Sequence, residues 1–197
     1  MPVRRALGIR TIFHLVGPLS NPAGAAAQVM GVYAPHLVPL AAEAMVLLNT
    51  RHAFVVHGDT GKEIDDTGSS ASGQRSASGP GGMDEFSISG PSHVAEVHNG
   101  IVTLSTLTPE DVGLTRAPIE TLHGGDARTN AQILTAIFSG ERSPRRDIVL
   151  LNAAAVLVTA DLAPDLPTGI ALAAKTIDSG AVNTLLSALA ISQPTEP

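Results

Sequence analysis

The sequence predicts an α/β domain in which a mainly parallel central sheet, with one β-hairpin, is flanked by helices. Two stretches, 27–35 and 52–58, have the composition of short buried strands, and an apolar stretch with helical spacing, 36–49, lies between them. Strand, helix and strand joined by short connections are typical of a βαβ unit with parallel strands. Ligands bind beyond the carboxyl ends of such strands, so we expect His57, Gly58 and the residues after them to lie near a site.

The middle of the chain predicts a hairpin followed by a short helix. An Asn-Gly pair at 99–100 stands between two β-favouring runs within 93–107, which is a strong signal for a two-residue turn. In 107–114, Thr108 can cap a single helical turn that has Pro109 at its start.

The last third of the chain predicts helices. Asp126 can cap a helix that Gly140 ends, and Ser143, followed by proline, opens a second helix so apolar that it must be buried. Two further helical stretches, divided near residue 180, complete the set. Because no internal repeat is present, we expect residues 1–197 to form a single α/β domain.

Residues 59–82 interrupt this pattern with a low-complexity stretch that is too polar to pack into a core. Structureless loops of this length are uncommon inside compact domains and are either functional or disordered. We expect a disordered insertion.

Composition excludes several classes of protein. The net charge of −6, the aromatic content of 3% and the absence of Trp argue against a nucleic-acid partner. No Cys is present, so disulfides, a thiolate nucleophile and a Cys-based zinc site are excluded. The N-terminus resembles a signal peptide, but His14, Gly17 and Pro18 break its apolar stretch. We expect a cytoplasmic protein with no membrane partner.

Motifs for catalysis are weak, and no catalytic residue is assigned. The segment around Lys62 lacks two positions that a P-loop needs, and no nucleophile elbow or zinc-spaced histidine pair is present. The glycine pair within 123–130 could bind an anion at a helix start, but ordinary helix capping is the favoured interpretation. A structural role is likewise favoured for His57.

Two charged groups are candidate binding sites. Arg4, Arg5 and Arg10 could clamp a carboxylate or a phosphate, or could be a solvated helix start. Asp84 and Glu85 follow a glycine run, where a turn could direct both carboxylates at one Mg²⁺. From chemistry alone, an exposed acidic pair is the favoured interpretation of these two residues.

Seven stretches, taken together and in order, resemble successive blocks of the anthranilate phosphoribosyltransferase family. They cover nearly the whole chain apart from the insertion. They are "VRRALGIRTIFHLVGPLSNPA" (3–23), "QVMGVYAP" (28–35), "VVHG" (55–58), "GMDEFSISGPSHVAEV" (82–97), "LTPEDVGL" (107–114), "GGDARTNAQIL" (124–134) and "RRDIVLLNAAAVL" (145–157).

The resemblance implies a fold, a reaction and a set of site residues. The fold would be the C-terminal domain type of phosphoribosyltransferases and nucleoside phosphorylases. The reaction joins anthranilate to the ribose of 5-phosphoribosyl 1-pyrophosphate (PRPP), releases pyrophosphate and depends on Mg²⁺. Arg4 would meet the anthranilate carboxylate, Gly17 and Pro18 would line the anthranilate path, and Asp84 and Glu85 would hold Mg²⁺ against the pyrophosphate.

Three features depart from the family. The family's N-terminal helical portion, which carries a PRPP-binding loop, precedes the first matching block, so we expect this chain to have little or no activity alone. A homodimer, or a separate N-terminal chain that completes the site, would be its partner. His14 replaces the usual Asn, and the insertion lies directly before Asp84.

Two rival functions stay open. One is a non-catalytic relative that binds nucleic acid, against which the acidic balance and the retained Asp84-Glu85 pair count. The other is a pyrimidine-nucleoside phosphorylase, which shares the fold, although the block around Gly17 is closer to the anthranilate enzymes.

Overall fold

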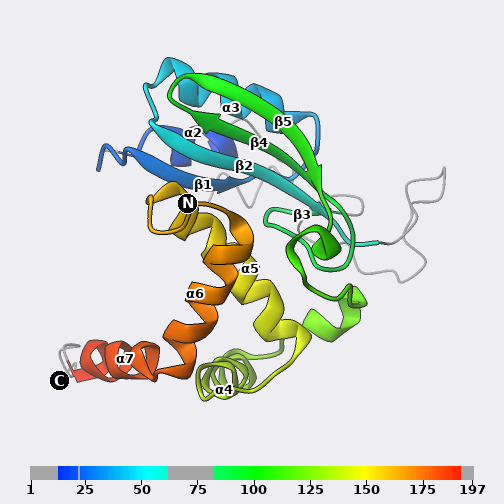
Figure 1. The fold of residues 1–197 in the computed structure, drawn as a ribbon, viewed down its shortest axis with the longest axis vertical. Coiled ribbons are helices and arrows are strands. Elements are labelled where there is room, and N and C mark those ends of the chain that lie inside the picture. The colour runs from blue at the N-terminus through cyan, green and yellow to red at the C-terminus, as the bar shows by residue number, and fades with distance from the viewer. Residues whose placement is uncertain (1–12, 22, 62–81, 192–197) are drawn as a thin grey trace.

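The structure is a computed structural model that describes residues 13–21, 23–61 and 82–191. Within these ranges a five-stranded sheet is combined with helices (Figure 1). The elements in chain order are α2 (Phe13–Leu19), β1 (Ala27–Gly31), α3 (Leu37–Leu47), β2 (His52–Asp59), β3 (Gly82–Met83), β4 (Ser92–His98), β5 (Ile101–Leu107), the 3₁₀ turns η1 (Pro109–Val112) and η2 (Ile119–Leu122), α4 (Ala127–Phe138), α5 (Pro144–Thr159), α6 (Leu166–Asp178) and α7 (Ala181–Ile191).

The predicted βαβ unit is confirmed, because β1 and β2 pair in parallel around α3. The strands follow the order β1-β2-β4-β5, and β3 also pairs with β2. The α/β class with a hairpin and flanking helices is therefore as predicted, but the sheet is less parallel than expected, since β3, β4 and β5 all join it antiparallel. A two-residue turn joins β4 to β5, and a connection this short allows only an antiparallel pairing of these two strands.

Helices cover both faces of the sheet, because side chains alternate along each strand. Val55 on β2 packs with Met45 of α3 on one face. Phe54 and Val56 point to the other face, where they meet Leu151 of α5. The helix pair α5 and α6 continues away from the sheet, and α4 and α7 lie at its far end (Figure 1).

Local signals in the sequence placed several boundaries correctly. Asn99 and Gly100 form the hairpin turn with φ values of 50° and 82°. Asp126 caps α4 by accepting a hydrogen bond from the Thr129 N–H at 2.8 Å. Thr108 precedes η1, and Asp111 accepts hydrogen bonds from its backbone N–H and its hydroxyl, both at 2.7 Å.

The chain enters and leaves the low-complexity stretch at paired residues. Asp59 at the end of β2 is the partner of Gly82, and Gly58 is the partner of Met83. The sheet is therefore continuous across the point where the extra residues join it. Residues 62–81 lie outside the described ranges, so the disordered insertion stays a prediction, as does the single-domain assignment.

Candidate active site

The segment that carries Asp84 and Glu85 crosses the carboxyl ends of β1 and β2. A Cβ atom on Gly31, the last residue of β1, would collide with the backbone carbonyl of Asp84, and one on Gly58 would collide with that of Glu85. Only glycine allows the two strands to come this close to the crossing backbone. The acidic pair therefore lies at the position where α/β sheets bind their ligands.

Two buried serines hold this segment in place. The Ser87 hydroxyl donates to the Asp59 carbonyl at 2.6 Å and accepts from the Ser89 N–H at 2.9 Å. The Ser87 N–H in turn donates to the Ser92 hydroxyl at 2.9 Å. Ser87 and Ser92 are at most 1% exposed, so these bonds are shielded from water.

Asn152 of α5 fastens the same segment from the helical side. Its Oδ1 accepts from the Phe86 N–H at 3.0 Å, and its Nδ2 donates to the Phe86 carbonyl at 3.1 Å. Nδ2 also donates to the carbonyl of Ile148, one turn earlier on α5. Phe86 itself is fully buried against Phe54, with the two ring centroids 5.9 Å apart. Two hydrogen bonds from the Asn152 side-chain amide thus fix Phe86, the residue that follows the acidic pair.

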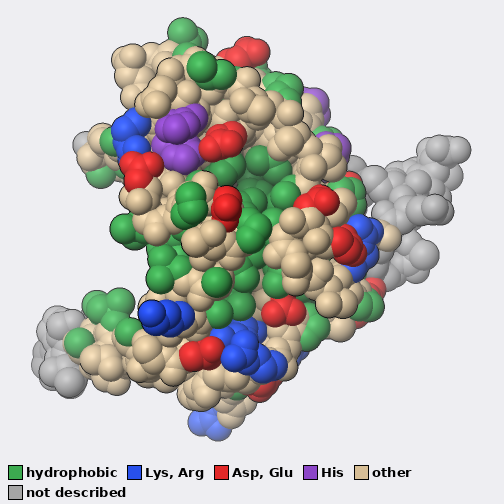
Figure 2. Space-filling model, viewed as in Figure 1, with side chains coloured by type: hydrophobic (Ala, Val, Ile, Leu, Met, Phe, Trp, Pro, Cys, Tyr) green, Lys and Arg blue, Asp and Glu red, His purple; other side chains and the backbone are tan. Residues whose placement is uncertain are grey.

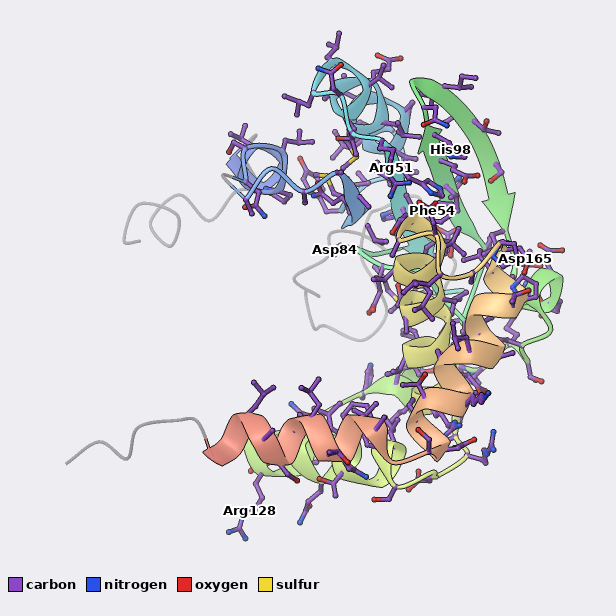
Figure 3. All side chains as sticks on the ribbon, turned by 60° about the vertical axis from the view of Figure 1, so that its left-hand side comes forward. Arg51, Phe54, Asp84, His98, Arg128 and Asp165 are labelled. Carbon is purple, nitrogen blue, oxygen red and sulfur yellow. The ribbon has the colours of Figure 1, made fainter. Side chains whose placement is uncertain are left out.

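Asp84 and Glu85 line a hollow of about 440 Å³. Figure 3 shows Asp84 beyond the strand ends, on the concave side of the molecule between the sheet and the lower helices. In the view of Figure 2, which is that of Figure 1, hydrophobic side chains gather in the middle of the molecule and acidic side chains lie around them. The other residues that line the hollow are Thr60, Gly82, Met83, Ile119, Leu122, His123 and Ile148.

The two carboxylates are close enough to influence each other. Desolvation by the protein around the Glu85 carboxyl raises its pKa, and the negative charge of Asp84 raises this pKa further. No ion pair joins either carboxylate to a basic side chain in the described ranges. Two adjacent carboxylates facing an open hollow form a donor set that suits Mg²⁺, which takes one or two protein carboxylates and keeps its other positions for water and phosphate oxygens.

His123 lines the hollow, and hydrogen bonds from residues at the starts of α5 and α4 hold the stretch 123–126. The Arg145 guanidinium donates to the carbonyl of His123 at 2.7 Å. The Gly125 N–H is occupied by the side chain of Asn130 at 2.8 Å, and Asp126 caps α4. Ordinary capping, the favoured interpretation of the 123–130 stretch, is therefore what the structure shows.

Of the three residues expected to bind anthranilate, the two that the structure describes do not line the hollow. Arg4 lies outside the described residues. Gly17 and Pro18 lie in α2, and the Pro18 carbonyl accepts from the Gln28 side chain at 3.4 Å. Neither residue lines the hollow, so the structure does not bring them together with Asp84 and Glu85.

His57 has the structural role that was favoured for it. The side chain is 4% exposed, and Nδ1 donates to the Val32 carbonyl at 2.8 Å. Its ring also lies against Gly82, where a Cβ atom would collide with it.

Sequence reasoning missed Asn152 and Ser87, which hold the acidic segment. Asn152 did carry a signal, because it is the one strongly polar side chain in the run 148–158 of an otherwise apolar helix. Ser87 carried none, since serine is ordinary in a Gly-rich and Ser-rich loop.

Comparison with known families decides the assignment. The model of the glycosyl transferase family, a/b domain, matches residues 1–74 and 71–183. The chain belongs to this family. The break between the two matched parts falls in the low-complexity stretch, so the family a/b domain is recognisable on both sides of it.

Relatives within the family share a name. The chain is 47% identical over 195 residues to an anthranilate phosphoribosyltransferase of Chloroflexus aggregans, which is 98% of this chain and 51% of the relative. It is 46% identical to one of Symbiobacterium thermophilum, over 94% of this chain and 48% of the relative. The chain thus spans about half the length of the curated relatives it matches.

Solved structures of family members have the same fold. Anthranilate phosphoribosyltransferase from Thermus thermophilus matches with a TM-score of 0.72 and 35% identity, over 94% of this chain and 49% of that one. The Saccharomyces cerevisiae enzyme in complex with PRPP and Mg matches with a TM-score of 0.69 and 25% identity, over 91% of this chain and 46% of that one.

No helix in the described ranges is both long enough and apolar enough to cross a membrane.

Proposed function

We propose that this chain is the α/β portion of an anthranilate phosphoribosyltransferase and that Asp84 and Glu85 hold the Mg²⁺ that accompanies PRPP. The observation that carries the proposal is the position of the acidic pair, at the carboxyl ends of β1 and β2 and facing an open hollow. The names of the relatives and the yeast complex with PRPP and Mg support it.

The residues of the chain would position the metal and the substrates and would neutralise negative charge. They would form no covalent bond to a substrate. Mg²⁺, when bound, would stabilise the negative charge that develops on the departing pyrophosphate. Asp84 and Glu85 would supply its protein oxygens, and Ser87 and Asn152 would keep those oxygens in a fixed place. A preorganised site of this kind lowers the barrier because little reorganisation is needed when the bond breaks.

Anthranilate recognition is the second part of the proposal. Arg4 would pair with the anthranilate carboxylate through its two-pronged guanidinium group, and Gly17 and Pro18 would line the path. The yeast family member in complex with 4-fluoroanthranilate supports a substrate of this class. Since the chain covers about half of its relatives, we expect the remaining contacts to come from a further portion of chain, and the reaction to take place in the cytoplasm.

A chimaera tests this function. The half of the Chloroflexus aggregans relative that this chain does not match is fused before residue 1, and the loss of anthranilate fluorescence is followed with PRPP and Mg²⁺. We expect turnover in the chimaera and none in the same chimaera with Asp84→Asn and Glu85→Gln. A folded chimaera that fails to consume anthranilate, or that instead cleaves uridine with phosphate, contradicts the proposal.

A further inference from the structure

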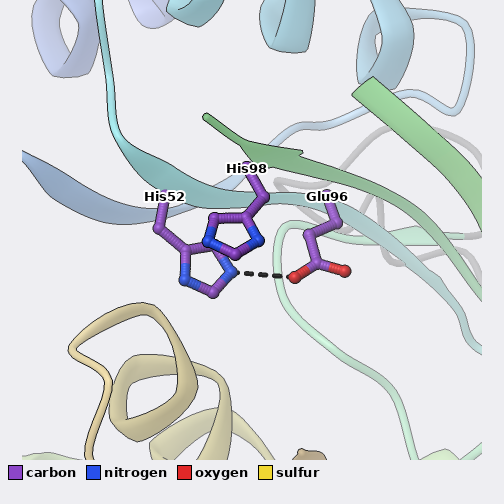
Figure 4. Close-up of side chains that lie close together, drawn as sticks. All are labelled: His52, Glu96 and His98. Atoms are coloured by element: carbon purple, nitrogen blue, oxygen red, sulfur yellow. Dashed lines mark hydrogen bonds and ion pairs between the residues drawn. The ribbon is translucent and has the colours of Figure 1, made fainter. Parts of the chain in front are cut away.

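A second cluster of ligand-type side chains lies at the end of the sheet opposite to Asp84 and Glu85. His52 begins β2 and is paired directly with His98, the last residue of β4. Glu96 precedes His98 by two positions, so both side chains point to the same face of the sheet as His52. Figure 4 shows the three side chains together. The length of β2 places this cluster about 20 Å from the acidic pair.

Contacts in the cluster already join its members. His52 Nε2 lies 2.8 Å from Glu96 Oε1, and the rings of His52 and His98 stack with centroids 4.5 Å apart. His52 is 4% exposed, while His98 is exposed. The cluster therefore has one fixed, buried member and two members that can turn toward a ligand. Histidine, acidic and basic side chains are seen gathered on the upper left of the face in Figure 2.

His52 also has a carboxylate on its other side. Its Nδ1 is buried, has no hydrogen-bond partner among the described residues and lies 3.9 Å from Oδ1 of Asp161, which follows α5. Arg51 holds Asp161 in place through an ion pair. In metal-binding histidines the second ring nitrogen donates to a carboxylate that fixes the tautomer. Asp161 lies beside Nδ1 and could take this role after a small movement.

The ligand atoms lie near one another, and a turn of the exposed His98 side chain would bring them to the separations of a metal site. One atom from each of His52, Glu96 and His98 lies within 4.8 Å of the other two, and no other group of three such side chains in the described ranges comes as close. Zn–N bonds of about 2.0–2.1 Å in a tetrahedron require ligand separations of about 3.4 Å. His98 must leave its stack to reach this spacing, because a histidine binds a metal in the plane of its ring.

We propose that His52, Glu96 and His98 form a site for a divalent transition-metal ion of the Zn²⁺ type, separate from the Mg²⁺ site. Two imidazoles and one carboxylate suit such an ion better than Mg²⁺, which prefers oxygen. In the free protein His52 Nε2–H donates to Glu96. On metal binding Nε2 becomes a ligand, and the proton is carried by Nδ1, facing Asp161. The bound ion joins the start of β2 to the β4–β5 hairpin.

Titration of the whole chain with Zn²⁺ against a chromogenic chelator tests this site. We expect one Zn²⁺ per chain and at least about tenfold weaker binding in His98→Ala and in Glu96→Gln. Co²⁺ in the same site should give the visible absorption of a tetrahedral ion. His98 is exposed, so its replacement leaves the fold intact, and a circular dichroism spectrum checks this.

Matched variants separate this site from other sources of binding. His36→Ala removes an exposed histidine elsewhere, and Asp84→Asn with Glu85→Gln removes the acidic pair; both should leave Zn²⁺ affinity unchanged. Absence of binding, or binding that survives His98→Ala, or binding weakened equally by His36→Ala, overturns the proposal. Because the readout is metal binding and not turnover, the result is independent of the proposed enzymatic function.

Discussion

Individual residues at the ends of β1 and β2 decide how the acidic pair is presented. Gly31 and Gly58 leave the space that the backbone of Asp84 and Glu85 occupies, and the two carboxylates then face the same hollow. Burial of the Glu85 carboxyl raises its pKa, and repulsion from the charge of Asp84 raises this pKa further. A divalent cation bound by the pair would relieve this repulsion. Without the cation, replacing one carboxylate should show how much the pair lowers the free energy of unfolding.

Glu85→Gln tests the raised pKa of Glu85 through the pH dependence of stability. Because the pKa of Glu85 is raised in the folded chain, the unfolded chain loses this proton first as the pH rises above the ordinary value of 4.5. The wild type therefore loses this contribution to stability across this window, until the pH passes the folded pKa, and Glu85→Gln lacks this part of the loss. Urea unfolding over a pH series should show that the free energy of unfolding of the variant, relative to that of the wild type, increases as the pH rises. A difference that is constant with pH would contradict this account.

Gly31→Ala tests the close approach of the backbones. The new methyl group would meet the Asp84 carbonyl, so one of the two segments must move, at a cost of about 3 kcal/mol in the free energy of unfolding. Chemical denaturation measures this loss. Gly17→Ala is the control, because its Cβ would meet no described atom within 4 Å and α2 should tolerate it. Equal stability of the two variants would show that the crossing is looser than described.

At the scale of elements, α5 and the 84–92 segment depend on each other. Asn152 lies on the face of α5 that packs on the sheet, and it satisfies both backbone groups of Phe86. The Ser87 and Ser92 hydroxyls complete the bonding from the sheet side. The segment is therefore held by its contacts with two elements and not by any regular structure of its own.

Asn152→Ala should loosen this segment. The substitution leaves the Phe86 N–H and carbonyl buried without partners, which costs about 2–4 kcal/mol. Amide hydrogen exchange should become faster at Phe86 and at the neighbouring amides. Asn183→Ala is the matched control. It removes a single hydrogen bond from the Asn183 side chain to the Phe138 carbonyl, at 2.9 Å, and should leave the amide exchange of Phe86 unchanged. Unaltered exchange at Phe86 in Asn152→Ala would contradict the role given to Asn152.

The low-complexity stretch should be dispensable for the sheet. Asp59 and Gly82 are partners, so a short Gly-Ser turn in place of 62–81 can join them without a change of register. The shorter loop should raise the free energy of unfolding by at most about 1.5 kcal/mol. Thermal unfolding and limited proteolysis of both chains check this. Loss of the folded state on shortening would show that the stretch contributes to the core.

The parts of the fold predicted from the sequence are those with local signals. The turn at Asn99, the cap at Asp126 and the strands around α3 depend on neighbours in the chain, so their positions were readable. The place of β4 beside β2 depends on a long-range choice of partner, and a mainly parallel sheet was expected instead. The contact between Asn152 and Phe86, 66 positions apart, is invisible to local pattern for the same reason.

At the scale of the whole molecule, the acidic site lies on the concave side, where the sheet faces the helices at the far end (Figure 3). The site residues carried over by resemblance divide between the hollow and α2, with Arg4 outside the described residues. The chain also spans about half the length of its relatives. Metal binding can therefore be tested on this chain directly, whereas PRPP binding and turnover call for the chimaera.

Calorimetric titration of the chimaera with PRPP, with and without Mg²⁺, is the most direct test of the claim that Asp84 and Glu85 hold the metal against the pyrophosphate. We predict binding that requires Mg²⁺ and that is lost in Asp84→Asn with Glu85→Gln, while His98→Ala binds as the wild type does. PRPP binding that is independent of Mg²⁺, or that survives loss of both carboxylates, would contradict the claim.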